Sequence, residues 1–319
     1  MIRSPDSLRF GPRLDIAAGS VAGADPFAGL ENQDNLLLID SAGRAVFLRD
    51  EQLAQVQVDG WARGHVRIAV LDGMGGHGRG REAAEAVVAG LLEMPACTTI
   101  AQLEDHLARL HARLQAEFAG GADAERRPGT TLTLLELPPG EAALLYHVGD
   151  SRLYEITPER IYPLTVDHVP ATAFAMTGVL GEQEWWQQVH GEHRSQIAQA
   201  FVLGNAFADP ALLDDALFAL TPARLPRFLR HLPDRRAVAL RPDAVYLLAT
   251  DGFWACAEPH LWVSRWPEIL GAGRSAADMV QLLFDAIRTT PPPGLHIDNL
   301  TAIVLRPLAD PDPEDETYA

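Results

Sequence analysis

The chain has 319 residues, of which 47% are apolar, so it can bury a sizeable core in one large or two small domains. Its formal net charge of −17 argues against sequence-independent nucleic-acid binding, because such a surface repels phosphates. Two cysteines, Cys97 and Cys256, are too few for a disulfide framework or a zinc site. The N-terminus has no signal-peptide pattern, and no apolar run approaches the ~18 residues that span a bilayer. We therefore expect a cytoplasmic protein without membrane contact.

The spacing of apolar residues predicts a series of strands and helices. In chain order, we expect strands at 14–18, 35–40, 45–48 and 66–71, helices at 81–94 and 101–118, strands at 130–137, 141–148 and 151–156, helices at 182–202, 211–220 and 225–231, a strand at 245–249, a helix at 275–288 and a last strand at 300–305. Because strands follow one another and the helices are grouped apart from them, the pattern predicts an α+β fold with antiparallel sheets. Ser275 is the expected N-cap of the last helix.

Five aspartates stand at the edge of an apolar strand, each beside a turn residue. They are Asp34, Asp72, Asp150, Asp251 and Asp298. Carboxylates gathered without His or Cys partners select hard cations such as Mg²⁺ or Mn²⁺, and the cation offsets their mutual repulsion. Two such ions bind and activate a water and polarise a phosphoryl oxygen, which is the chemistry of phosphoester hydrolysis. The alternative is that Asp-Gly and Asp-Asn are ordinary turn pairs.

Six segments, in this order, carry a resemblance to a known family. They read ENQDNLLL (31–38), VLDGMGGHGRGREAAE (70–85), HVGDSRLYEI (147–156), LTVDH (164–168), LLATDGFW (247–254) and IDNLTAIVL (297–305). Together they resemble the metal-dependent serine/threonine protein phosphatases of type 2C, the PPM family, in their bacterial branch. The resemblance implies a four-layer α-β-β-α sandwich of two antiparallel sheets flanked by helices. We expect one such domain over 1–309, with an atypical flap insert at about 169–240, and a disordered acidic tail at 310–319.

The resemblance also implies a ligand set for two Mn²⁺ or Mg²⁺ ions. Asp72 would bridge both ions, and the backbone carbonyl of Gly73 would complete the coordination of one. Asp251 and Asp298 would hold the other ion. Asp150, with Asp251, would hold a weaker third ion.

The implied reaction is direct attack of a metal-bridging hydroxide on phosphoserine or phosphothreonine. Asp34 would accept hydrogen bonds from metal-bound water, and Asp72 would position the attacking hydroxide between the ions. Met74 stands where some relatives have a histidine proposed as general acid, so His77 and His168 are candidate proton donors, with a structural role as the alternative for each. The expected partners are a phosphorylated protein substrate and a cognate Ser/Thr kinase.

Three departures from the family pattern keep two other functions open. Gln33 replaces a frequent Glu, and no arginine stands at 26–29, where many members grip the substrate phosphate. Arg13, Arg79 or Arg81 could substitute, and the sequence does not choose among them. Within the flap, 193–196 and 203–204 only faintly resemble the family pattern. The alternatives are a pseudo-phosphatase that binds a phosphoprotein or kinase without turnover, and a phosphatase acting on a small phosphorylated metabolite.

Overall fold

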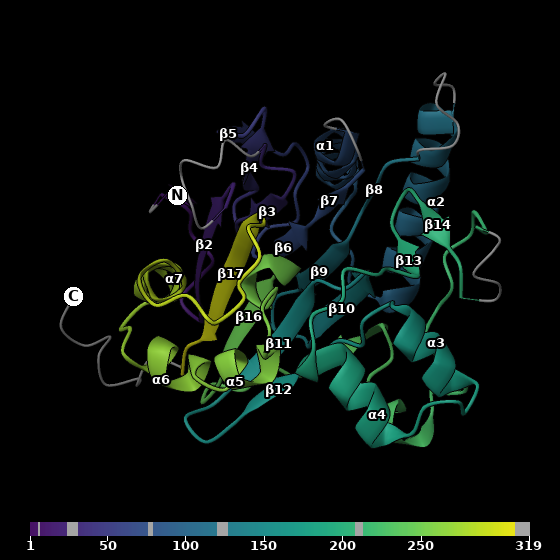
Figure 1. Ribbon diagram of the computed structural model, residues 1–319. Coiled ribbons are helices and arrows are strands. Elements are labelled where there is room, and N and C mark those ends of the chain that lie inside the picture. The colour runs from purple at the N-terminus through teal and green to yellow at the C-terminus, as the bar shows by residue number, and fades with distance from the viewer. Residues whose placement is uncertain (6, 24–30, 76–78, 120–126, 208–212, 310–319) are drawn as a thin grey trace.

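The computed structural model describes residues 1–5, 7–23, 31–75, 79–119, 127–207 and 213–309, and its strands form two large sheets (Figure 1). One sheet has six strands in the order β1 (Ile2–Arg3), β2 (Leu14–Val21), β17 (Leu300–Pro307), β16 (Val245–Ala249), β11 (Arg152–Ile156) and β12 (Ile161–Pro163). The other has seven strands in the order β15 (Arg235–Val238), β10 (Ala143–Val148), β9 (Leu132–Leu137), β6 (Val66–Leu71), β3 (Asn35–Ile39), β4 (Arg44–Arg49) and β5 (Gln52–Gln57). Neighbouring strands in both sheets are antiparallel, and every strand expected from the sequence is present.

Both faces of the central strands are buried, which is why they read as continuous apolar runs. In β3, Leu36 and Leu38 pack between the two sheets, whereas Leu37 and Ile39 pack under helices. Successive side chains of a strand point to opposite faces, so one strand contributes to two cores. The apolar layer between the sheets joins them face to face, and the predicted four-layer α-β-β-α sandwich is confirmed.

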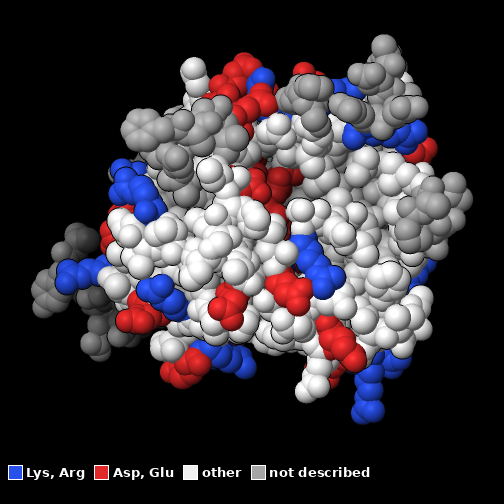
Figure 2. Space-filling view, in the orientation of Figure 1, with Lys and Arg blue, Asp and Glu red and all other residues white. Residues whose placement is uncertain are grey.

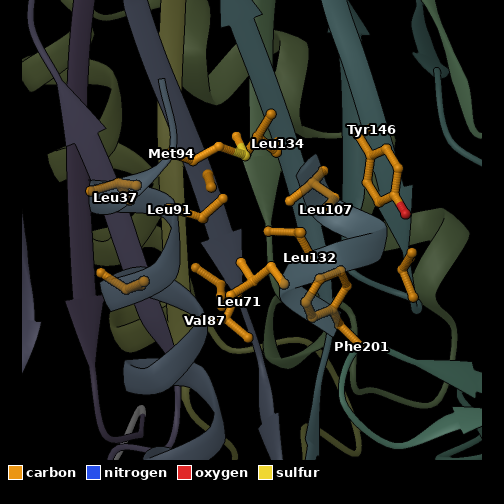
Figure 3. Packing of buried hydrophobic residues seen from close by; sticks show 14 of the residues in the cluster. Leu37, Leu71, Val87, Leu91, Met94, Leu107, Leu132, Leu134, Tyr146 and Phe201 are labelled. Carbon is orange, nitrogen blue, oxygen red and sulfur yellow. The ribbon is translucent and has the colours of Figure 1, made fainter. Parts of the chain in front are cut away.

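Two groups of helices form the outer layers. The seven-stranded sheet is covered by α1 (Arg79–Glu93) and α2 (Ile100–Ala119), and the six-stranded sheet by α5 (Pro259–Val263), α6 (Trp266–Gly271) and α7 (Ala276–Thr289). Figure 3 shows Val87 and Leu91 of α1 packed beside Leu71 and Leu132 of the sheet. The Oγ of Ser275 accepts the backbone N–H of Asp278, which confirms the expected N-cap of α7. None of the described helices is long and apolar enough to cross a membrane.

The part of the chain between β12 and β15 has short elements and an apolar cluster of its own. Its elements are α3 (Pro170–Met176), α4 (Glu182–Trp186), the π-helical turn η1 (Gln187–Gly191), the paired strands β13 (Gln199–Ala200) and β14 (Gly204–Asn205), and the 3₁₀ turn η2 (Arg227–Leu229). Trp185, Val189 and Leu229 belong to the cluster. In Figure 1, α3 and α4 lie beside the sheets rather than over either outer face.

Three helices expected in this part are wrong. The helix expected at 182–202 ends at Gly191, because the Val189 carbonyl accepts a hydrogen bond from Arg152 (2.6 Å) instead of continuing a helical ladder. The helix expected at 211–220 is absent over 213–220, where the chain is irregular. The one expected at 225–231 is only the turn η2, since Pro226 precedes it and Pro233 follows.

Candidate metal centre

The five aspartates singled out by the sequence come to the same end of the sandwich. Asp34 precedes β3 and Asp72 follows β6, and these strands are antiparallel neighbours with Asn35 opposite Leu71. Asp251 opens the 3₁₀ turn η3 (Asp251–Phe253) after β16, and Asp298 precedes the neighbouring strand β17. Asp150 precedes β11, whose Arg152 pairs with Ala249 at that same end of β16. Figure 2 shows a hollow in this face of the molecule with acidic side chains at its floor.

The charges of these five carboxylates act on one another. Burial, followed by Asp34, Asp251, Asp150 and Asp298 in that order, raises the pKa of Asp72 well above its usual range. Burial and the charge of Asp251 likewise raise the pKa of Asp150, and they raise that of Asp298 to about 6. Burial also raises the pKa of Asp251, against a hydrogen bond with Asp72 that lowers it. Such mutual repulsion in a buried place favours protonation or a bound cation.

Asp34 is the most enclosed of the five, at 2% exposure. Its Oδ2 accepts the Thr250 hydroxyl (2.8 Å), whereas its Oδ1 is buried without a hydrogen-bond partner in the described part of the protein. Burial is the main cause that raises its pKa to about 8, and Asp298 and Asp251 add to it. A buried carboxylate oxygen without a partner is costly unless a water or a cation satisfies it.

Two glycines let the backbone close around the aspartates. A side-chain carbon on Gly73 would collide with the carbonyl oxygens of Gln33 and Gly80, and one on Gly252 would collide with the carbonyl of Asn299. The first contact brings the start of α1 against the turn after Asp72. The second brings the turn after Asp251 against the start of β17. Only glycine allows backbone segments to approach so closely.

The residues present fit a hard divalent cation. Their donors are carboxylate oxygens and backbone carbonyls, which Mg²⁺ and Mn²⁺ prefer, and the cluster has both excess negative charge and an unpaired oxygen on Asp34. Among the described residues, no three acidic, His or Cys side chains already stand at mutual ligand spacing. The aspartates nevertheless lie close enough for the charge of Asp251 to raise the pKa of Asp34, Asp72 and Asp298.

The remaining candidate site residues are the two histidines and Gln33. His77 lies outside the described residues. His168 is fully buried, with Nδ1 accepting the Gly149 N–H (3.0 Å) and Nε2 facing Asp234 (3.2 Å). His168 therefore has the structural role that was its alternative to proton donation, because both ring nitrogens contact groups inside the fold. Gln33 donates its backbone N–H to Asn299 and its amide to Glu31.

None of the three arginines proposed as phosphate ligands faces the cluster freely. Arg13 lines a groove at the opposite end of β2, near the hairpin at Pro139. The guanidinium carbon of Arg79 lies 5.7 Å from the ring centre of Phe118. Arg81 is held by three carboxylates, which are Glu31, Asp50 and Glu85.

Sequence reasoning missed a pocket next to the cluster. It is lined by Asp150 and Asp251 together with Arg152, Asp167 and six residues between 188 and 196, among them His193 and Arg194. The only sequence signal for these residues was the faint flap pattern at 193–196. The ion pair between Arg152 and Asp167 (2.7 Å) is buried beneath this pocket.

Comparisons with known proteins agree with this geometry, although no protein-family model matches the chain. Protein phosphatase ppm-1.G of Caenorhabditis elegans is 26% identical over 190 residues, covering 58% of this chain and 36% of the relative. Protein phosphatase PhpP of Streptococcus pneumoniae is 29% identical over 127 residues, covering 38% of this chain and 51% of the relative. The chain thus spans about a third to a half of the length of the curated relatives it matches.

Solved structures match over almost the whole chain. The S. agalactiae serine/threonine phosphatase has a TM-score of 0.62 at 19% identity, covering 92% of this chain and 99% of its own. The Mycobacterium tuberculosis phosphatase PstP/Ppp has a TM-score of 0.59 at 21% identity, covering 93% and 100%. This chain has the fold of the bacterial serine/threonine phosphatases of known structure. Another solved structure of the PPM fold, the PstP catalytic domain, is in complex with two manganese ions, with a TM-score of 0.57 at 20% identity, covering 93% of this chain and 99% of its own.

Proposed function

We propose that this protein is a metal-dependent phosphatase that hydrolyses phosphoserine and phosphothreonine in proteins. The observation that carries the proposal is the convergence of five aspartates, one buried and four half-buried, from separate strand ends at one end of the sandwich. Their raised pKa values and the unpaired oxygen of Asp34 are what a site built for divalent cations needs before the cations bind. The PPM fold supports the same function.

The ligand roles follow from the placement of each aspartate. Asp72 interacts electrostatically with all four others, which supports its assignment as the bridging carboxylate, with the Gly73 carbonyl beside it. Asp251 and Asp298 come from neighbouring strands and are assigned to the second ion. Asp150 faces Asp251 and is assigned to a weaker third position. When bound, two divalent ions lower the pKa of a water and polarise a phosphoryl oxygen.

Asp34 has a positioning role in this proposal. Thr250 fixes one of its oxygens and leaves the other unpaired. That oxygen can accept a proton or a hydrogen bond from water, and its raised pKa suits a group that exchanges protons near neutral pH. His77 stays a candidate proton donor for the leaving group. The proposal includes a phosphorylated protein as substrate and a cognate Ser/Thr kinase as partner. It also places the protein in bacterial signalling in the cytoplasm, with Mn²⁺ or Mg²⁺ as cofactor.

The test combines Mn²⁺ calorimetry with turnover of an aryl phosphate and a phosphothreonine peptide. We expect Asp72→Ala and Asp251→Asn to lower turnover by at least about 100-fold and to weaken Mn²⁺ binding, because even residues outside the ligand set cost about 10- to 100-fold. Asp243→Asn is the matched control, since Asp243 is exposed and, among the residues that the structure describes, pairs with Arg241 alone. It should match the wild type in both measurements.

The outcomes separate the three functions. Hydrolysis of both substrates supports the proposal. Hydrolysis of the aryl phosphate without the peptide indicates a small-molecule phosphatase. Peptide binding without turnover, in protein loaded with Mn²⁺, indicates a pseudo-phosphatase and overturns the proposal.

A further inference from the structure

The pocket beside the aspartates carries excess negative charge, which is unfavourable for binding a phosphorylated substrate. Four acidic side chains line it, namely Asp150, Asp167, Glu192 and Asp251. A phosphoryl dianion entering the pocket is repelled by them unless fixed positive charge faces it as well. Bound cations would neutralise Asp150 and Asp251, and the chain contains no lysine, so any further positive charge in the pocket must come from arginine or histidine. Figure 2 shows few basic side chains around the hollow.

Most arginines close to the centre are already engaged. Arg152 lines the pocket, but its side chain is 3% exposed and its donors point inward. Its Nε and Nη2 bond Asp167, Nη2 also bonds the Val189 carbonyl, and Nη1 bonds the Tyr154 hydroxyl. Turning it toward a ligand would leave Asp167 buried and unpaired, which is costly. The start of α1 offers no better donor, because its arginines face Phe118 and three carboxylates.

Arg194 is differently placed. It lines the pocket with Asp150 and Asp251, and its side chain is 48% exposed. Its Nε and Nη2 both donate to a single oxygen, Oε2 of Glu192, at 3.1 and 2.8 Å. Its Nη1 makes no hydrogen bond with any described residue. The guanidinium can therefore exchange one carboxylate oxygen for phosphoryl oxygens, which it can bind through two parallel donors.

The segment that carries Arg194 is anchored at its beginning. It follows the π-helical turn η1, whose Val189 carbonyl is bonded by the buried Arg152. That arginine belongs to β11, the strand that follows Asp150. Arg194 is thus positioned relative to the aspartates through the sheet itself, five residues after an anchored carbonyl.

We propose that Arg194 is the phosphate-binding arginine of this protein, and that Glu192 holds its guanidinium in the pocket until a phosphoryl group displaces it. The inference rests on the proposed phosphatase function and names the residue that binds the substrate's phosphoryl group. It places the cation on the flap, at 194, rather than near the N-terminus.

The experiment measures binding of inorganic phosphate to the Mn²⁺-loaded protein by calorimetry, and kcat/KM for the phosphothreonine peptide. We expect Arg194→Ala to weaken phosphate binding by about 10- to 100-fold, the usual effect of losing hydrogen bonds to a charged group. The kcat/KM should fall by a similar factor. The phosphate affinity and kcat/KM of Arg194→Lys should lie between those of the wild type and Arg194→Ala, since lysine keeps the positive charge but lacks the planar guanidinium.

Arg241→Ala is the matched control. Arg241 is 45% exposed and pairs with Asp243, two residues away, through Nε (3.0 Å) and Nη2 (2.6 Å), and its Nη1 also lies 3.7 Å from Glu155. It does not line the pocket, and its loss should change neither measurement. Glu192→Gln should tighten phosphate binding, because it removes the anion that competes for Arg194.

The inference is overturned if Arg194→Ala binds phosphate as Arg241→Ala does, or if Arg79→Ala loses binding while Arg194→Ala keeps it. If Glu192→Gln binds phosphate more weakly than the wild type, the proposal that Glu192 holds the Arg194 guanidinium until phosphate displaces it is overturned. The phosphatase proposal fails independently of this inference if the wild-type protein binds Mn²⁺ and phosphate but hydrolyses neither substrate.

Discussion

Gly73 shows how a missing side chain shapes the centre. Its position, directly after Asp72, is where the backbones of Gln33 and Gly80 come closest to the turn. Any Cβ there would push α1 away from the strand that carries Asp72. Because the neighbouring atoms are backbone rather than flexible side chain, the strain has little room to relax.

We therefore predict that Gly73→Ala lowers the free energy of unfolding by about 1–3 kcal/mol and weakens Mn²⁺ binding, as an overpacked site does. Denaturant unfolding and calorimetry measure the two effects. Gly271→Ala is the control, since a Cβ on this last residue of α6 meets nothing within 4 Å. Equal stability of the two variants would show that the contacts at Gly73 can yield.

The residues most easily predicted from the sequence were those whose signal is local. Asp72 and Asp251 each follow an apolar strand and precede a glycine, and the structure places both at the same end of the sandwich. The partner of Asp34 was not predictable, because Thr250 lies 216 residues away and only the packing of the two sheets brings them together. Arg194 was missed for a similar reason, since its distance from the aspartates depends on a flap without clear periodicity.

The secondary-structure elements were likewise predictable where their signal is local and not where it depends on distant contacts. The central strands were predicted from continuous apolar runs, and the helices α1, α2 and α7 from one periodic apolar face that packs against a sheet. The helix expected at 182–202 has no such continuous apolar face, and the chain turns at Gly191. The cause is a side chain from another element, since Arg152 binds the Val189 carbonyl. A contact of this kind has no trace in the local sequence.

The ion pair between Arg152 and Asp167 holds the chain just before the flap against the six-stranded sheet. Both side chains are nearly fully buried, and the Asp167 backbone carbonyl accepts the Thr172 hydroxyl of α3 (2.7 Å). Burial disfavours the charge of Asp167, and the adjacent guanidinium opposes the rise in its pKa. Such a pair is costly to break because it leaves one buried charge without a partner.

At this scale we predict that Asp167→Asn lowers the free energy of unfolding by about 3–5 kcal/mol, the usual result of removing one member of a buried pair. The readouts are denaturant unfolding and proteolysis within the flap. Asp243→Asn, which breaks an exposed pair, should leave stability nearly unchanged. If both variants unfold alike, the pair does not anchor the flap.

For the whole molecule, the aspartate cluster makes stability depend on whether cations are bound. Without cations, folding buries carboxyl groups whose pKa values are raised by burial and mutual repulsion. The unfolded chain has no such cluster, and its carboxyl groups ionise near pH 4. A group with a raised pKa in the folded state binds more protons folded than unfolded, so raising the pH through that pKa favours unfolding.

Asp34 determines the pH range in which this effect can be measured, because its pKa is about 8 in the folded protein. The buried His147 and His190, whose pKa values burial lowers, act with the opposite sign, but only at lower pH, where an unfolded histidine would be protonated. Between about pH 7 and 8.5 the metal-free protein should therefore lose stability as the pH rises. Bound cations pair with the ionised carboxylates, so they should flatten or reverse this dependence.

We predict that, in chelator, the free energy of unfolding of the wild type falls from about pH 7 to 8.5, and that Asp34→Asn falls less because it removes one proton-binding group. Denaturant unfolding at several pH values measures both slopes, with Asp243→Asn as a control that keeps the wild-type slope. Mn²⁺ binding should release protons over the same window, which calorimetry in buffers of different ionisation enthalpy detects. A wild-type slope that Asp34→Asn leaves unchanged would mean that Asp34 is already ionised in the metal-free fold. The site would then be held ready for cations by repulsion among carboxylates rather than by bound protons.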